Sequence, residues 1–266
     1  MSIGLSTYAF FWQLSSRVEK PLTLVEVVGK TAELGVGLLQ ICDHPAIEDF
    51  DAEQLRALRA AGDAAGVAFE LGTRGLRPEH LRRYLDIADV LGAKVLRSMV
   101  NTADHRPTPA EALADLRAIA PELAERGVDL ALETYEQVST SALVDLVEGV
   151  DHPRVGICLD PANTVAALEQ PIAVVDRCAE HVLNVHSKDF AFTRSEGWVG
   201  FQLAGALMGT GLLDYDHLLD RVRPDERGVN QIVEHWLPWQ GDEDVTRKTE
   251  QQWTAHSVDY LRSTRP

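Results

Sequence analysis

The sequence has few cysteines, a shortage of positive charge and no long apolar run. Its 266 residues include three cysteines, at positions 42, 158 and 178, and none belongs to a CxxC pair. We therefore predict buried free thiols rather than disulfides or a thiolate metal site. Lys and Arg number 25 against 41 Asp and Glu, which gives a formal charge of −16. Such an acidic surface repels nucleic acids and anionic membranes, so we expect neither as a partner.

Two further absences narrow the class of protein. No apolar stretch approaches the roughly 18 residues that a membrane-spanning helix needs. The first residues, MSIGLSTYAFF, lack the basic and apolar regions of a secretory signal, so we expect a cytoplasmic protein. No GxGxxG motif follows the first β-rich run, which weakens the alternative of a doubly wound open sheet.

What the sequence does contain is a regular alternation of β-rich and helical segments. Most of the β-rich runs are continuously apolar, as is typical of parallel strands that are buried on both faces. Helical spacing is clear in Ala52–Ala65 and in Thr108–Arg126, where Thr108 is a predicted cap and Pro109 a predicted first residue. We predict a single (β/α)₈ TIM barrel over residues 1–266. The eight β-rich runs are Ile3–Phe10, Val36–Asp43, Val67–Thr73, Lys94–Asn101, Val128–Glu136, Val155–Asn163, Val182–Phe190 and Asn230–Trp236.

The stretch between the seventh and eighth β-rich runs is too long for an ordinary connection. We predict that residues 191–213 form a long active-site loop that acts as a lid, with apolar Trp198, Phe201, Leu203 and Met208 facing the substrate. Its glycines at positions 205, 209 and 211 suit either backbone amides that approach an anion or tight turns and hinges. We favour turns and hinges.

Four consecutive β-rich runs each end in one possible metal ligand: Glu133, Asp160, His186 and Glu234. Each follows apolar residues, and burial of such charges without a partner costs several kcal/mol per ion. Other partners are conceivable: Arg97 or Arg74 for the glutamates, the core for His186, and a helix cap for Asp160. Because all four recur at equivalent positions of adjacent strands, we predict one shared divalent metal ion. The oxygen-rich set favours Mn²⁺, with Mg²⁺ or Co²⁺ as alternatives.

Other polar and aromatic residues near the strand ends are candidates for the reaction itself. We predict catalytic roles for Glu133, Glu234 and Lys188. Phe10, Phe11 and Trp12 follow the first run and could form an apolar wall with Trp236. The predicted substrate contacts are His44, Glu70, Arg74, Arg97, Asn163, Arg194, His235 and Trp236.

Four short motifs resemble the xylose-isomerase-like barrel superfamily of sugar isomerases, epimerases, dehydratases and endonuclease IV. They are E-T-Y-E at 133–136, L-D-P-A-N at 159–163, V-H-S-K-D at 185–189 and V-E-H-W at 233–236. The resemblance covers essentially the whole chain, places one metal on the four ligands above, and implies a homodimer or homotetramer. Ser139 and Asn163 stand where ketose 3-epimerases have Glu and His, which argues against a ketohexose 3-epimerase. Asn163 also replaces an endonuclease IV ligand.

The resemblance and the metal site leave three functions open. We expect an isomerase or epimerase of a small keto-sugar, polyol or sugar acid, in which a carbonyl substrate forms an enediolate while Glu133 and Glu234 move the proton. The alternative is a lyase with the same intermediate: a 3-oxo sugar acid decarboxylase, a dehydratase or a C–O lyase. Lys188, Arg74, Arg97 and Arg194 would suit its carboxylate. The third is a sugar-binding barrel without turnover.

Overall fold

The strands close into a parallel barrel, as the alternating pattern predicts. The computed structural model describes residues 2–195, 197 and 199–264. Within these residues the barrel order is β1-β10-β7-β6-β5-β4-β3-β2, and every neighbouring pair is parallel. The barrel strands are β1 (Ile3–Ser6), β2 (Leu38–Cys42), β3 (Ala68–Arg74), β4 (Val95–Met99), β5 (Asp129–Glu133), β6 (Val155–Leu159), β7 (Val182–Ser187) and β10 (Asn230–Val233).

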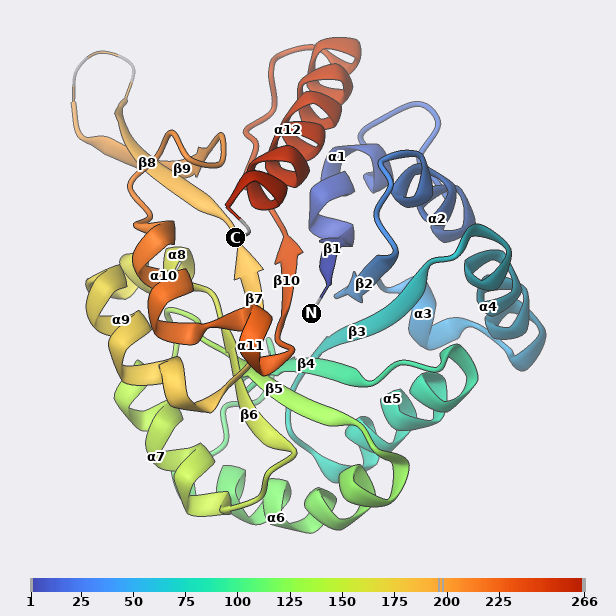
Figure 1. Ribbon diagram of the computed structural model, residues 1–266, viewed down its shortest axis with the longest axis vertical. Coiled ribbons are helices and arrows are strands. Elements are labelled where there is room, and N and C mark those ends of the chain that lie inside the picture. Colours follow the sequence, from blue (N-terminus) through green and yellow to red (C-terminus); the bar gives the residue numbers. More distant parts are fainter. Residues whose placement is uncertain (1, 196, 198, 265–266) are drawn as a thin grey trace.

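Helices surround the barrel and bury their apolar faces against it (Figure 1). The main ones are α2 (Leu24–Glu33), α4 (Ala52–Ala65), α5 (Pro78–Leu91), α6 (Pro109–Arg126), α7 (Thr140–Val150), α9 (Pro171–Cys178), α10 (Tyr215–Val222) and α12 (Glu243–Ser263). Shorter helical segments at the rim and in connections are η1 (Thr7–Phe10), α1 (Phe11–Leu14), α3 (Ala46–Asp49), α8 (Pro161–Thr164), η2 (Val165–Ala167), η3 (Ala179–His181) and α11 (Pro224–Arg227).

The helix ends follow the predicted capping chemistry. Thr108 caps α6 through a capping box with Glu111, and Pro109 is its first residue. Gly66 and Gly127 end α4 and α6 in the left-handed conformation, which costs glycine little because it has no Cβ. The sequence predictions for these two helices are therefore confirmed.

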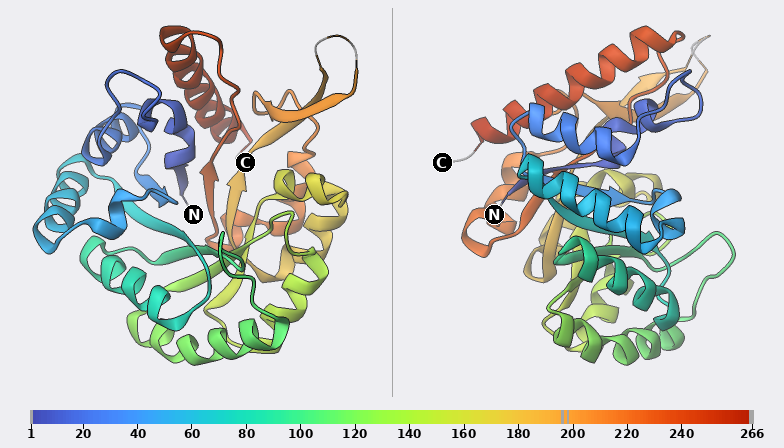
Figure 2. Two further views of the ribbon diagram at one scale, coloured as in Figure 1. Left: turned by 180° about the vertical axis from the view of Figure 1, so that it is seen from behind. Right: turned by 90° about the vertical axis from the view of Figure 1, so that its right-hand side faces the viewer.

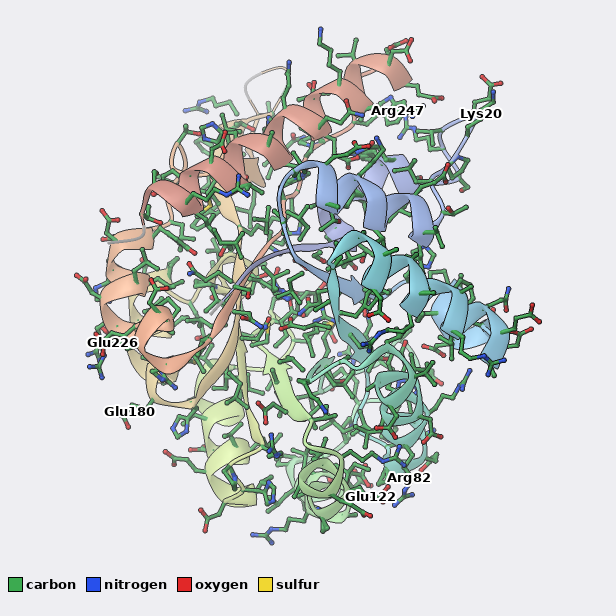
Figure 3. All side chains as sticks on the ribbon, turned by 45° about the vertical axis from the view of Figure 1, so that its right-hand side comes forward. Lys20, Arg82, Glu122, Glu180, Glu226 and Arg247 are labelled. Carbon is green, nitrogen blue, oxygen red and sulfur yellow. The ribbon has the colours of Figure 1, made fainter. Side chains whose placement is uncertain are left out.

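Many charged side chains lie on the outer surface, and the cysteines lie in the interior. Charged side chains project from the outer helices (Figure 3), where Arg82 of α5 pairs with Glu122 of α6 at 2.7 Å. The three cysteines are buried and free, as predicted. In the described part of the chain, the helices are too short or too polar to cross a membrane.

The seventh β-rich run differs from its prediction, because it divides into two strands. Barrel strand β7 ends at Ser187, and β8 (Asp189–Arg194) pairs with β9 (Phe201–Ala206) in an antiparallel hairpin outside the barrel. The hairpin projects from the rim near α12 (Figure 1, Figure 2). The predicted active-site loop thus contains ordered strands, and its action as a lid stays a prediction. Trp198 lies outside the described residues.

Asp189 ties the base of this hairpin to the glycine-rich turn that follows it. Its carboxylate accepts hydrogen bonds from the backbone N–H groups of Gly209, Gly211 and Leu213, at 3.0, 2.8 and 3.0 Å. The amides of both glycines are therefore taken by an internal carboxylate rather than left for an external anion. A Cβ at Gly211 would lie 2.3 Å from Asp189 Oδ1, so this close approach requires glycine.

This packing predicts a specific cost for a single methyl group. Gly211→Ala should lower the free energy of unfolding by about 1–3 kcal/mol, the usual cost of overpacking. Gly29→Ala is the matched control, because its Cβ would meet nothing within 4 Å on helix α2, and it should leave stability unchanged or raise it. Urea titrations of the two variants measure the difference. Equal stabilities would show that the turn yields to the added methyl group.

Candidate metal centre

The four predicted metal ligands meet at the carboxyl ends of four adjacent barrel strands. Glu133 is the last residue of β5, Asp160 follows β6, His186 lies near the end of β7, and Glu234 follows β10. Each offers one ligand atom, and these atoms all lie within 4.8 Å of one another. All four side chains are buried. A group of this composition and spacing could hold a metal ion.

The ligand atoms are short of hydrogen-bond partners, which fits a cation between them. His186 Nδ1 lies 3.3 Å from Glu133 Oε1, 3.7 Å from Asp160 Oδ2 and 3.5 Å from Glu234 Oε2. Among the described residues, neither His186 Nδ1 nor Glu234 Oε1 has a hydrogen-bond partner. Buried polar atoms are normally satisfied, and three carboxylates with one imidazole suit a divalent ion such as Mn²⁺ or Mg²⁺.

Arg97 neutralises one side of the ligand group. Its guanidinium pairs with Glu133 and, at 3.0 Å, with Asp43. Burial alone would raise the pKa of Glu133, but Arg97 and the His186 ring together hold that pKa below its ordinary value. Arg97 thus makes the pair with a glutamate that the sequence left open beside the metal ion.

Lys188 places a second cation inside the group. Its Nζ lies 2.7 Å from Asp160 Oδ2 and 3.3 Å from Glu234 Oε2, and it donates to Asn163 Oδ1 at 3.2 Å. Burial would lower the pKa of this amine, but the carboxylates raise it well above its ordinary value. Asn163 also donates to Glu133 Oε1 at 2.9 Å, so this predicted substrate contact bridges a ligand and the lysine.

Glu70 lies below the ligands, inside the barrel. Its carboxylate accepts from the side-chain amides of Gln40, Asn184 and Asn230 at 3.1, 3.0 and 2.7 Å. Burial raises the pKa of Glu70, although these amides oppose the shift. The arrangement favours a supporting role over substrate contact. Sequence reasoning missed Gln40, whose only signal was one polar residue within the apolar run LLQIC.

The remaining predicted contacts occupy the rim. Half-exposed Arg74 bonds Asp43 and the Tyr8 hydroxyl, at 3.0 and 3.2 Å. His44 is half-buried, and its Nδ1 has no hydrogen-bond partner within the described residues. Buried His235 stays neutral, because burial lowers its pKa to about 4. Arg194 is exposed on the hairpin over the Phe201 ring.

A cavity of about 290 Å³ lies at this rim, beside His235 and Glu250. Its aromatic lining comprises Tyr8, Phe11, Trp12 and Trp236, and the hairpin contributes Leu203 and Ala204. The ring of Trp236 lies 4.3 Å from Lys188 Nζ, which connects the cavity wall to the ligand group. Phe10, the other aromatic residue proposed for this wall, is buried in the core.

Removal of any one ligand should weaken metal binding. We expect each of four variants to reduce Mn²⁺ affinity by more than about 100-fold: Glu133→Ala, Asp160→Ala, His186→Ala and Glu234→Ala. This loss exceeds the usual effect of removing a residue that only hydrogen-bonds a ligand. Asp176→Asn is the control, because this half-exposed carboxylate pairs with Arg221 on the surface. Titration calorimetry on metal-free protein should give one ion per chain. Binding that is absent, or indifferent to all four changes, would refute the assignment.

Known proteins match the chain over its whole length. A family model described as xylose isomerase-like TIM barrel matches residues 28–264. The 3-oxo-isoapionate decarboxylase of Pectobacterium atrosepticum is 52% identical over 266 residues, which cover 100% of this chain and 97% of that protein.

Solved structures show the same fold at low identity. D-psicose 3-epimerase from Clostridium cellulolyticum H10, solved with D-tagatose, superposes with a TM-score of 0.74 at 13% identity and covers 99% of both chains. A xylose isomerase-like TIM barrel protein from Mycobacterium smegmatis, in complex with magnesium, superposes with a TM-score of 0.70 at 16% identity and covers 97% of both chains. With the family match and the full-length relative, these findings show that the chain belongs to the xylose isomerase-like TIM barrel family.

Proposed function

We propose that this chain is a divalent-metal-dependent decarboxylase of a 3-oxo sugar acid, with 3-oxo-isoapionate or a close analogue as substrate. The observation that carries this proposal is the 52% identity, over the whole chain, to a 3-oxo-isoapionate decarboxylase. The isomerase expected from the sequence is not confirmed, and this relative favours the lyase alternative. The epimerases share the fold at identities too low to transfer their reactions.

The proposed reaction needs no oxidant or second substrate. The bond between the carboxylate carbon and C2 breaks, and CO₂ leaves. The electron pair remains on C2 and spreads to the oxygen of the C3 carbonyl, which gives an enediolate. A proton then adds to C2. The catalytic requirements are therefore stabilisation of one oxyanion and delivery of one proton.

The ligand group and its two cations fit these requirements. A divalent ion held by Glu133, Asp160, His186 and Glu234 would stabilise negative charge on a substrate oxygen; we propose Mn²⁺ or Mg²⁺. Lys188 keeps a proton at Nζ within the same group. We assign to it a hydrogen bond to the developing oxyanion. Glu234 remains the candidate for protonating C2, because Arg97 and the His186 ring hold the pKa of Glu133 below its ordinary value.

The aromatic cavity suits the group that leaves. A carboxylate loses its charge as it becomes CO₂, so an apolar surrounding disfavours the reactant more than the transition state. Phe11, Trp12 and Trp236 supply such a surrounding beside Lys188. Half-exposed Arg74, bonded to Tyr8 at the cavity edge, can attract an anionic substrate despite the overall negative charge. A role of the β8–β9 hairpin as lid, a single-domain organisation and assembly into a homodimer or homotetramer remain proposals.

The products distinguish this proposal from the isomerase. With Mn²⁺ and 3-oxo-isoapionate, the enzyme should release one CO₂ per substrate. In D₂O, the carbon that carried the carboxylate should gain one deuterium, because its new proton comes from an exchangeable group. Mass spectrometry and NMR of the product measure both. Conversion to an isomer with all carbons retained would contradict the decarboxylase and support the isomerase.

Lys188→Met tests the assigned oxyanion contact. The change keeps most of the length of the side chain but removes its charged end, so kcat should fall about 10²–10³-fold, as when an oxyanion donor is lost. Mn²⁺ should still bind, because the four ligands are intact. Lys94→Met is the matched control on an exposed lysine and should leave kcat unchanged. A metal-loaded Lys188→Met enzyme with full activity would remove Lys188 from the mechanism.

A further inference from the structure

A chain of hydrogen bonds runs across the barrel interior from a buried carboxylate to the His186 ring. Glu70 of β3 accepts from Gln40 Nε2 at 3.1 Å, and Gln40 Oε1 lies 2.8 Å from His186 Nε2. Gln40 belongs to β2 and His186 to β7, and strands β1 and β10 lie between them in the barrel. The contact therefore depends on side chains that cross the interior, not on neighbouring strands.

Glu70 determines which way the Gln40 amide points. The same Glu70 oxygen also accepts from Asn184 Nδ2 at 3.0 Å, while Gln40 Nε2 donates to Asn184 Oδ1 at 3.2 Å. Three side-chain amides donate to the Glu70 carboxylate, as they would to its ionised form, which only accepts hydrogen bonds. Turning the Gln40 amide over would bring its carbonyl oxygen against that carboxylate. The Nε2 group is thus fixed toward Glu70, and Oε1 is fixed toward His186.

The direction of the Gln40 amide determines the tautomer of the His186 ring. Because Gln40 Oε1 can only accept, the ring must donate from Nε2. A neutral imidazole has one ring proton, so the lone pair is then on Nδ1. Nδ1 is the atom that lies 3.3–3.7 Å from the oxygens of Glu133, Asp160 and Glu234.

We propose that Glu70 and Gln40 are positioning residues, which act as a relay that presents the His186 Nδ1 lone pair to the metal. Metal-bound histidines commonly donate their second N–H to a carboxylate or carbonyl; here an amide is inserted between carboxylate and ring. The inference rests on the metal centre of the proposed function, but not on the identity of the reaction.

Gln40→Leu removes the acceptor and should weaken Mn²⁺ binding about 10–100-fold, the usual effect of losing such a partner. Calorimetry on metal-free protein measures this affinity. NMR of Zn²⁺-loaded protein provides a second readout, because a hydrogen-bonded Nε2–H gives a downfield, slowly exchanging proton signal. That signal should be present in the unaltered protein and lost in Gln40→Leu.

An exchange of the two side chains separates a relay from simple packing. Gln40→Glu combined with Glu70→Gln keeps the total charge and still places an acceptor next to His186 Nε2. The new glutamine amide at position 70 then donates to the new carboxylate at position 40. The Asn184 side-chain amide can turn over, so that its N–H group faces position 40 and its oxygen faces position 70. We expect the double variant to retain the NMR signal and an Mn²⁺ affinity close to that of the unaltered protein.

Gln231→Leu is the matched control, because this buried glutamine lies on β10, next to β7, and its Oε1 accepts a hydrogen bond from the Tyr215 hydroxyl. Circular dichroism establishes that each variant folds. Unchanged Mn²⁺ affinity and NMR signal in Gln40→Leu would overturn the relay. If Gln40→Leu does not fold, weak binding by a folded double variant would overturn it as well. If the unaltered protein binds Mn²⁺ and shows the NMR signal but releases no CO₂ from 3-oxo-isoapionate, only the proposed reaction is contradicted.

Discussion

The main physical constraint on this structure is the burial of three carboxylates close together inside the barrel rim. Glu133 ends β5, while Asp160 and Glu234 directly follow β6 and β10. In an apolar interior each ion would cost several kcal/mol. Arg97 and Lys188 offset part of that charge through direct contacts. Among the described residues, His186 Nδ1 and Glu234 Oε1 have no hydrogen-bond partner, so the group has room for the further charge of a divalent ion. The same three carboxylates that are costly to bury could therefore hold a metal ion.

The barrel explains why these side chains converge. Parallel strands in register bring their carboxyl ends to one rim, so one ligand per strand is enough to build the site. Asn163 follows β6 and Lys188 follows β7, and their side chains link the possible ligands to one another. The chemistry proposed for the site, stabilisation of one oxyanion next to an apolar cavity, follows from this combination of buried charge and aromatic wall.

The sequence revealed the barrel and the cluster of four possible ligands because each depends on a local pattern. An apolar run that ends in Glu133 or His186 is visible in one short segment. The β8–β9 hairpin was predicted as a loop, because its strands extend a run that began in the barrel. The relay through Gln40 was not predicted, since it requires side chains from β2, β3 and β7 to meet. Arg97 pairs with Glu133, one of the glutamate partners that the sequence left open, and with Asp43, a contact that appears only in three dimensions. Its contact with substrate stays a prediction.

Crystallography of the Mn²⁺-loaded protein, with anomalous data, tests the central claim most directly. The account predicts a single anomalous peak per chain, bound by one oxygen each of Glu133, Asp160 and Glu234 and by Nδ1 of His186, at about 2.0–2.4 Å. Nε2 of the ring should still contact Gln40. A chain without a peak at this position, or a metal bound through Nε2, would contradict the account.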